Sequence, residues 1–208
     1  MSGAGGQGSG LLSQERSIST TLLDQVRARD PGAWQRLEKL YGPVVDQWGR
    51  CCGLQDADVA DVRQNVFMAV VRAIGSFRRE RPADSFRGWL WTITKREVCQ
   101  LHRQRQKHAL AQGGTTAQQQ FAELPDDPPD SSDAGKHADV LSGVVRRAAE
   151  LVRAEFEPRT WQAFWRTTVD GQPAAAVAAE LGTTVTAVWK SSSRVKKRIR
   201  EELEGLLD

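Results

Sequence analysis

The side chains best suited to bind another molecule in this sequence are basic groups and hydroxyls on one helix-forming stretch. From Thr186 to Arg200 the chain carries six Lys and Arg residues and no acidic residue. Lys and Arg neutralise phosphates, and together with small hydroxyls they also form hydrogen bonds with base edges in the major groove. We therefore predict a face for duplex DNA made of Thr184, Thr186, Trp189, Lys190, Ser193, Arg194 and Lys197.

The surrounding residues predict the elements that would position this face. A short helix from Pro173 to Leu181, a turn over residues 182–184 and a longer helix from Val185 to about Leu203 have the spacing of a helix-turn-helix. Ala178 is small where the two helices must cross closely. Gly182 supplies the turn conformation that β-carbons disfavour.

The longer helix also needs an inward side, which Val188, Val195 and Ile199 can form. Ser192 interrupts this side where a larger apolar residue is expected, so the packing pattern is weaker there. A plain helical hairpin with a solvated basic face is therefore the alternative interpretation of this module.

A second basic helix is predicted from Phe86 to about Lys107, with Ser85 as its N-cap. Lys95, Arg96 and Arg103 lie away from its apolar stripe, and aromatic residues lie close by in the sequence. Cations suit phosphates, and rings stack on exposed bases. A solvated face on a structural helix explains the composition equally well.

Three further helices are predicted before it, at Leu22–Arg29, at Pro31 to about Arg50 and from Asp56 to Gly75. Apolar residues recur at three- and four-residue steps along the second and third of these helices. No convincing alternating strand pattern occurs anywhere in the sequence, so the predicted fold class is all-α.

The distribution of charge predicts two modules and a linker. Residues 1–107 carry 17 basic and 11 acidic side chains, residues 108–139 carry 1 and 6, and residues 140–208 carry 11 and 9. The middle segment is rich in Gly, Gln, Ser, Asp and Pro, which is typical of a loop. We expect a flexible leader over residues 1–19, domains over 20–107 and 140–208, and a flexible acidic linker between them, for which a plain spacer is the simplest explanation.

Other classes of protein find little support in the sequence. His102 and His108 lie on different helix faces, and neither a His-Glu-x-x-His motif nor a P-loop lysine occurs. We therefore expect no catalytic residue, no metal and no cofactor. The absence of an apolar stretch long enough for a membrane and the three cysteines without Cys-x-x-Cys spacing indicate a cytoplasmic protein that does not insert into a membrane.

Three stretches together resemble a known family. Asp56 to Phe67 (DADVADVRQNVF), Ser85 to Ile93 (SFRGWLWTI) and Leu181 to Val188 (LGTTVTAV) are similar to motifs of bacterial sigma factors of the extracytoplasmic-function type. Each stretch is modest alone, whereas the three in this order and at these separations are specific. The resemblance covers about residues 20–105 (region two of the family) and 140–207 (region four).

The resemblance implies a protein that binds without catalysis and directs core RNA polymerase to promoter DNA. The first motif implies docking on polymerase through Asp58, Asp61, Gln64, Asn65, Phe67 and Met68. The second implies binding of the melted minus-ten element, together with the preceding loop, through Arg79, Arg81, Ser85, Lys95, Arg96, Gln100 and Arg103. The basic face of the helix-turn-helix would read the minus-thirty-five element, and the resemblance leaves an anti-sigma factor open as a further partner.

Departures from the family pattern concern promoter sequence and the polymerase face. Asn65 replaces a usual Glu, Arg96 a usual Asn and Gln100 a usual Asp, while Trp189-Lys190 replaces a common Lys-Ser pair.

Two alternative functions remain. A stand-alone helix-turn-helix regulator explains only the C-terminal module, and a nucleic-acid-modifying enzyme lacks a set of catalytic residues.

Overall fold

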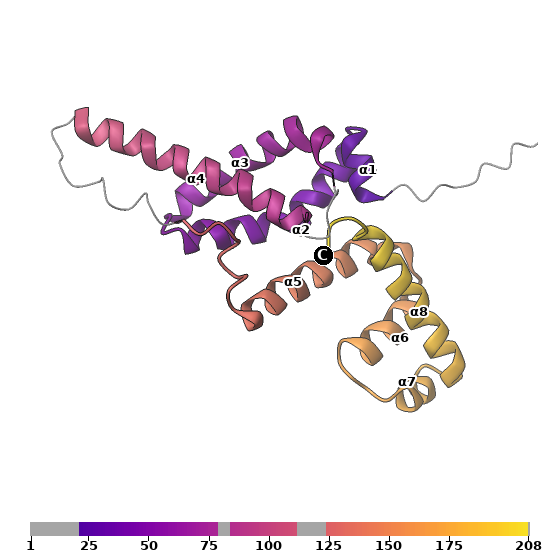
Figure 1. Cartoon of the computed structure of the whole chain (residues 1–208). Helices are drawn as coiled ribbons and strands as arrows, with labels where there is room; N and C mark the ends of the chain where they lie inside the picture. Colours follow the sequence, from indigo (N-terminus) through magenta and orange to yellow (C-terminus); the bar gives the residue numbers. More distant parts are fainter. Residues whose placement is uncertain (1–20, 79–83, 112–123, 208) are drawn as a thin grey trace, which may run out of the picture.

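The fold is built from helices alone in the parts of the chain that the structure describes, residues 21–78, 84–111 and 124–207 of a computed structural model. The predicted all-α class is therefore confirmed. Figure 1 shows the N-terminal helices as one bundle, with a second group of helices attached along one side. The α-helices are α1 (Leu22–Arg27), α2 (Pro31–Cys51), α3 (Asp56–Ala73), α4 (Phe86–Ala111), α5 (Ala134–Val152), α6 (Pro158–Thr168), α7 (Ala174–Glu180) and α8 (Val185–Glu202), and the 3-10 turns are η1 (Ile74–Ser76) and η2 (Arg153–Glu155).

The N-terminal bundle is held together by aromatic side chains that α2 and α4 place in its core. Tyr41 meets Phe86 with ring centroids 5.0 Å apart, and Trp48 meets Trp91 at 5.5 Å, both edge to face. Such pairs stabilise a core beyond the effect of the area they bury. Helix α3 packs on α4 through a stripe that includes Val62. The bundle thus exposes the opposite side of α3.

The C-terminal group contains the predicted helix-turn-helix. Helices α7 and α8 pack against each other, and Gly182 between them has φ +59°, the left-handed conformation that glycine adopts without strain. Thr184 caps α8 by accepting a hydrogen bond of 3.2 Å from the backbone N–H of Ala187. Helix α8 also packs on α6, so its orientation is set from two sides.

Ser192 has a structural explanation that the sequence did not reveal. Its side chain is buried, and its hydroxyl lies 2.9 Å from the hydroxyl of Thr167 on α6. A buried polar group that is hydrogen-bonded avoids most of the desolvation penalty. The serine therefore joins α8 to α6 through a polar contact instead of an apolar one.

The two helix groups share one hydrophobic core, which the sequence did not predict. The turn after α8 inserts Leu206 beside α2, where the Tyr41 hydroxyl donates a hydrogen bond to the Leu206 carbonyl oxygen. Arg147 on α5 donates to the Leu40 carbonyl oxygen at 2.9 Å. Buried Glu202 pairs with Arg36 on α2 at 2.9 Å.

Part of the predicted acidic linker is packed against the N-terminal bundle. The Asp130 carboxylate is buried, forms an ion pair with buried Arg87 and accepts a hydrogen bond of 2.7 Å from the Trp48 indole. The Trp91 indole donates to the Pro125 carbonyl oxygen at 3.2 Å. Residues 124–130 therefore form a strap that packs on α2 and α4. Helix α5 begins at Ala134, inside the predicted linker. The predicted leader lies outside the described residues.

Candidate nucleic-acid and protein interfaces

The outer face of α8 presents all of the predicted duplex-DNA residues to solvent. Buried Val188, Val195 and Ile199 turn the helix so that its other side is free. Trp189 is the most open of the large apolar side chains there, at 56% exposed. An exposed indole surrounded by cations and hydroxyls is more typical of a nucleic-acid contact than of a helix face that only meets water. The residues that this face brings together are Thr184, Thr186, Trp189, Lys190, Ser193, Arg194 and Lys197.

The cations of α8 fall into two groups. Within the described part of the chain, Lys190 and Arg194 take part in no ion pair, and Lys197 has a weak exposed one with Glu201 at 3.7 Å. Arg198 instead pairs with Glu155 at 2.7 Å and with Glu202 at 3.0 Å. Partial burial opposes its charge, but these carboxylates raise the pKa of Arg198 overall. The free cations are available to phosphates and bases, whereas Arg198 is structural.

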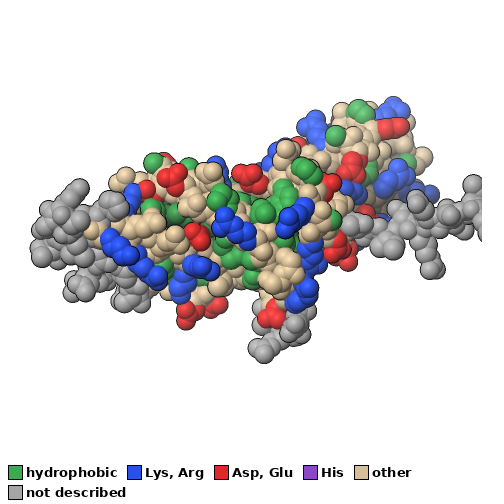
Figure 2. All heavy atoms as spheres, turned by 90° about the horizontal axis from the view of Figure 1, so that it is seen from above, with side chains coloured by type: hydrophobic (Ala, Val, Ile, Leu, Met, Phe, Trp, Pro, Cys, Tyr) green, Lys and Arg blue, Asp and Glu red, His purple; other side chains and the backbone are tan. Residues whose placement is uncertain are grey.

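Helix α4 presents a second basic face. Arg96, Gln100 and Arg103, which the resemblance assigns to the minus-ten site, are exposed on it. The Ser85 side chain caps the start of α4, because its hydroxyl accepts a hydrogen bond of 2.9 Å from the Gly88 N–H. Figure 2 shows Lys and Arg side chains beside hydrophobic ones on the upper side of the N-terminal bundle.

Lys95 lies at the margin of this face. Its ammonium pairs with Asp126 of the strap at 2.8 Å, and this hydrogen bond lowers the pKa of the Asp126 carboxyl. The pair is exposed on the Asp126 side, so water and salt screen it and DNA phosphate can compete with it. Arg79 and Arg81 lie outside the described residues.

A hollow of about 490 Å³ opens where the chain enters α4. Phe77 and Trp89 form part of its wall with ring centroids 5.0 Å apart, and Asp84, Ser85 and Thr92 supply polar groups. Trp89 is half-buried, because it packs against the hydrophobic core and also borders this hollow.

A third surface lies between α2 and α3. It surrounds a hollow of about 510 Å³ that includes Asp61, Gln64, Phe67 and Met68 of the predicted polymerase face. Half-buried Trp34 on α2 packs against the hydrophobic core and also borders this hollow. Half-buried Phe67 and exposed Met68 are thus flanked by polar side chains, an arrangement typical of a protein-binding surface.

Two of the predicted polymerase contacts lie elsewhere. Asn65 is exposed on α3 but does not border the hollow. Asp58 is buried, and its carboxylate forms an ion pair with Arg105 of α4. A carboxylate so placed fixes α3 against α4 and is not presented to a partner. The prediction for Asp58 is therefore replaced by a role in joining two helices.

Comparison with known proteins identifies the N-terminal bundle. Residues 39–108 match the family model described as Sigma-70 region 2, a stretch that contains most of α2, all of α3 and most of α4. Residues 39–108 are thus similar to a sigma-70 region 2. The sigma-factor resemblance predicted from the sequence motifs is thereby confirmed. The matched residues include the α3 side of the hollow between α2 and α3 and the basic face of α4.

A curated relative gives the same result. The chain is 32% identical over 82 residues to the RNA polymerase sigma factor CnrH of Cupriavidus metallidurans. The match covers 39% of this chain and 41% of that protein, so it spans less than half the length of the relative.

Within the described ranges, no helix is long and apolar enough to span a membrane, and no group of three His, Cys, Asp or Glu side chains could hold a metal ion.

Proposed function

We propose that this protein is an alternative sigma factor that binds core RNA polymerase and directs it to promoters, without catalysis of its own. The observation that carries the proposal is the match of residues 39–108 to sigma-70 region 2, together with the exposed surfaces that these residues form. Its partners are then core polymerase and promoter DNA, its place is the cytoplasm, and an anti-sigma factor would be a further partner. The proposed domains are residues 20–107 and 140–208.

The polymerase surface of the proposal is the hollow between α2 and α3, with Asp61, Gln64, Phe67 and Met68 at its border and Asn65 beside it. Association would bury Phe67 and Met68 while the polar groups form hydrogen bonds around them. Such an apolar centre with a polar rim is the usual anatomy of a protein interface.

The minus-ten element would be held between the hollow at the start of α4 and the exposed cations Arg96 and Arg103, with Gln100 between them. Taking a base out of the stack costs a few kcal/mol, which stacking on an aromatic ring and hydrogen bonds to the base can offset. Half-buried Trp89 supplies a ring for that stacking, and buried Phe77 supports it from behind at a centroid distance of 5.0 Å. Lys95, Arg79 and Arg81 would contribute positive charge toward the strand.

The minus-thirty-five element would be read by α8 in the major groove. Thr186, Lys190 and Ser193 occupy the half of the helix that meets base edges in a helix-turn-helix, and Lys197 lies where phosphates are expected. Substitution of Lys190 or Arg194 by Ala should cost about 1–3 kcal/mol of promoter discrimination if that side chain bonds to a base.

Transcription with purified components tests the proposal directly. Core RNA polymerase with the full chain should start synthesis at specific promoters, whereas a stand-alone helix-turn-helix regulator cannot do so. Gln64→Ala combined with Phe67→Ala should abolish both association with core polymerase and initiation. Arg72→Ala is the matched control, because Arg72 is exposed on the same helix but does not border the hollow. Unchanged co-purification of the double variant with polymerase would contradict this docking surface.

A further inference from the structure

Trp189 on α8 is a large apolar side chain that the fold leaves uncovered. It is 56% exposed, and it belongs to neither of the two hydrophobic clusters of the described residues. Within those residues its indole also takes part in no ring contact and no hydrogen bond. Its neighbour Val188 is buried in one cluster with Ala163 of α6 and Val177 of α7, which fixes this part of α8. The indole is therefore held where only another molecule can cover it.

A second exposed apolar side chain lies beside Trp189. Val185 begins α8 four residues earlier and is 40% exposed. Side chains four residues apart lie on the same face of a helix. Val185 and Trp189 are the large apolar side chains that α8 exposes, and together they form the apolar patch of α8. Two adjoining apolar groups on an otherwise polar face mark a contact site more clearly than a single one does.

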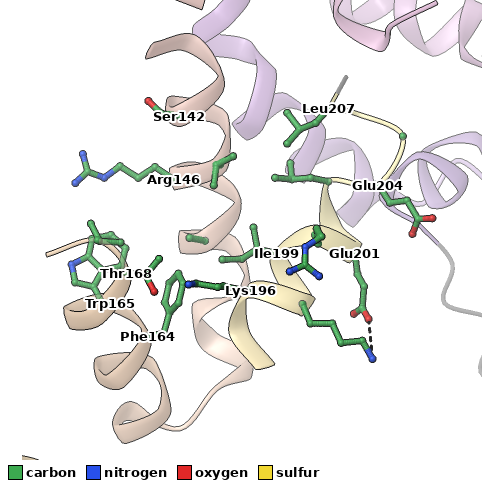
Figure 3. Close-up of a pocket in the computed structure, with 17 residues that line it drawn as sticks. Ser142, Arg146, Phe164, Trp165, Thr168, Lys196, Ile199, Glu201, Glu204 and Leu207 are labelled. Atoms are coloured by element: carbon green, nitrogen blue, oxygen red, sulfur yellow. Dashed lines mark ion pairs between the residues drawn. The ribbon is translucent and has the colours of Figure 1, made fainter. Parts of the chain in front are cut away.

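The apolar patch is separate from the inner side of α8. Figure 3 shows Lys196 and Ile199 beside the hollow that α8 forms with α5 and α6, and the α8 residues that border this hollow begin at Lys196. Trp189 lies seven residues earlier, about two turns of helix away. The patch therefore meets a molecule that approaches the N-terminal half of α8 from outside.

The surroundings of the apolar patch favour duplex DNA as that molecule. Lys190, Ser193 and Arg194 are exposed nearby on α8, and no acidic residue occurs between Thr186 and Arg200. Cations neutralise the phosphates of DNA, and hydroxyls form hydrogen bonds with base edges. An apolar group among them has a counterpart in the major groove, because thymine presents a C5-methyl group there and the other three bases do not.

We propose that Trp189, with Val185 beside it, recognises a thymine of the minus-thirty-five element through the C5-methyl group of that base. This inference rests on the proposed function, in which α8 enters the major groove. The indole and the valine would cover the methyl group and remove apolar surface of both molecules from water, while Lys190 bonds to a neighbouring base or phosphate. Trp189 is then a residue that determines promoter sequence, in addition to contributing to affinity.

Replacement of thymine by deoxyuridine tests the contact. Selection from random duplexes by core polymerase with the full chain first gives the minus-thirty-five element, and each thymine in it is then replaced singly. Deoxyuridine pairs with adenine as thymine does but lacks the C5-methyl group. At the thymine that Trp189 covers, the replacement should weaken binding about fourfold, which is the contribution expected of one buried methyl group.

Variants assign this effect to the indole. Trp189→Ala should bind the thymine and deoxyuridine duplexes equally, whereas Trp189→Phe should retain the preference, because a phenyl ring can also cover a methyl group. Lys197→Ala is the matched control on the same helix. It should weaken the binding of both duplexes alike and retain the fourfold ratio, because phosphate contacts do not distinguish the two bases. Circular dichroism of each variant should retain the helical spectrum.

Two results would overturn the thymine contact. It is wrong if no thymine of the element is sensitive to deoxyuridine, or if Trp189→Ala retains the sensitivity. If Trp189→Ala also weakens co-purification with core polymerase while the ratio is unchanged, the apolar patch binds a protein instead.

Selection by the full chain without polymerase separates this inference from the proposed function. A selected duplex with a thymine that is sensitive to deoxyuridine, together with no association with polymerase, would refute the sigma-factor role and retain the thymine contact. Failure to select any sequence, with or without polymerase, would refute both.

Discussion

Asp130→Ala should destabilise the protein strongly, although Asp130 belongs to a segment that looks like a plain spacer in the sequence. The Asp130 carboxylate is 3% exposed and pairs with Arg87, which is 4% exposed. Removing the acid leaves the Arg87 guanidinium buried without its counter-charge, a change that typically costs about 3–5 kcal/mol. The Trp48 indole N–H, now 2.7 Å from the carboxylate, loses its acceptor as well.

Urea unfolding followed by circular dichroism measures this change. A loss of about 3–5 kcal/mol from a protein with a typical 5–15 kcal/mol of stability would shift the midpoint far below that of the wild type. Asp127→Ala is the matched control, because Asp127 lies three residues earlier and is exposed. That variant should stay within about 0.5 kcal/mol of the wild type, as surface substitutions usually do.

A double variant distinguishes the buried charge from general disruption. Arg87→Met with Asp130→Leu removes both charges and keeps apolar volume in their place, so it should be more stable than Asp130→Ala alone. If Asp130→Ala and Asp127→Ala unfold at the same urea concentration, residues 124–130 are not docked on the bundle and the reasoning from burial is refuted.

Three further results are expected. Arg194→Ala should lower the affinity for duplex promoter DNA and flatten its dependence on salt, as measured by fluorescence anisotropy, and an unchanged salt slope would contradict phosphate or base contact. Tyr41→Phe should cost about 0.5–1.5 kcal/mol in urea unfolding, because it removes the hydrogen bond to the Leu206 carbonyl oxygen. Burial, with smaller contributions from neighbouring thiolates, raises the pKa of Cys52 to about 11, so only about 1% of it is thiolate at pH 9. Iodoacetamide at pH 9 should therefore modify exposed Cys51 first, as mass spectrometry would report, and equal rates would contradict the burial of Cys52.

Local patterns predicted the helices of the N-terminal bundle and of the helix-turn-helix, whereas α5 was not predicted and begins inside the expected linker. Pro31 at the first turn of α2, Ser85 before α4 and Gly182 before α8 all lie where the sequence placed them. The exposed residues of α8 also followed from spacing, because the buried Val188 and Val195 determine which side remains free.

Contacts between distant segments could not be predicted in this way. Asp130 lies among Asp, Ser and Pro, and only the fold shows that it meets Arg87 and Trp48. The apparent misfit of Ser192 depended on Thr167, 25 positions away.

The contact between Leu206 and α2 has a practical consequence for anyone who studies the halves separately. A fragment of residues 21–111 would leave the surface around Tyr41 without its covering leucine, and a fragment of residues 134–207 would leave Leu203 and Leu206 open to water. Each piece would then be prone to self-association through a surface that is internal in the intact molecule. Weak binding or aggregation of either piece would report on the cut rather than on the native protein.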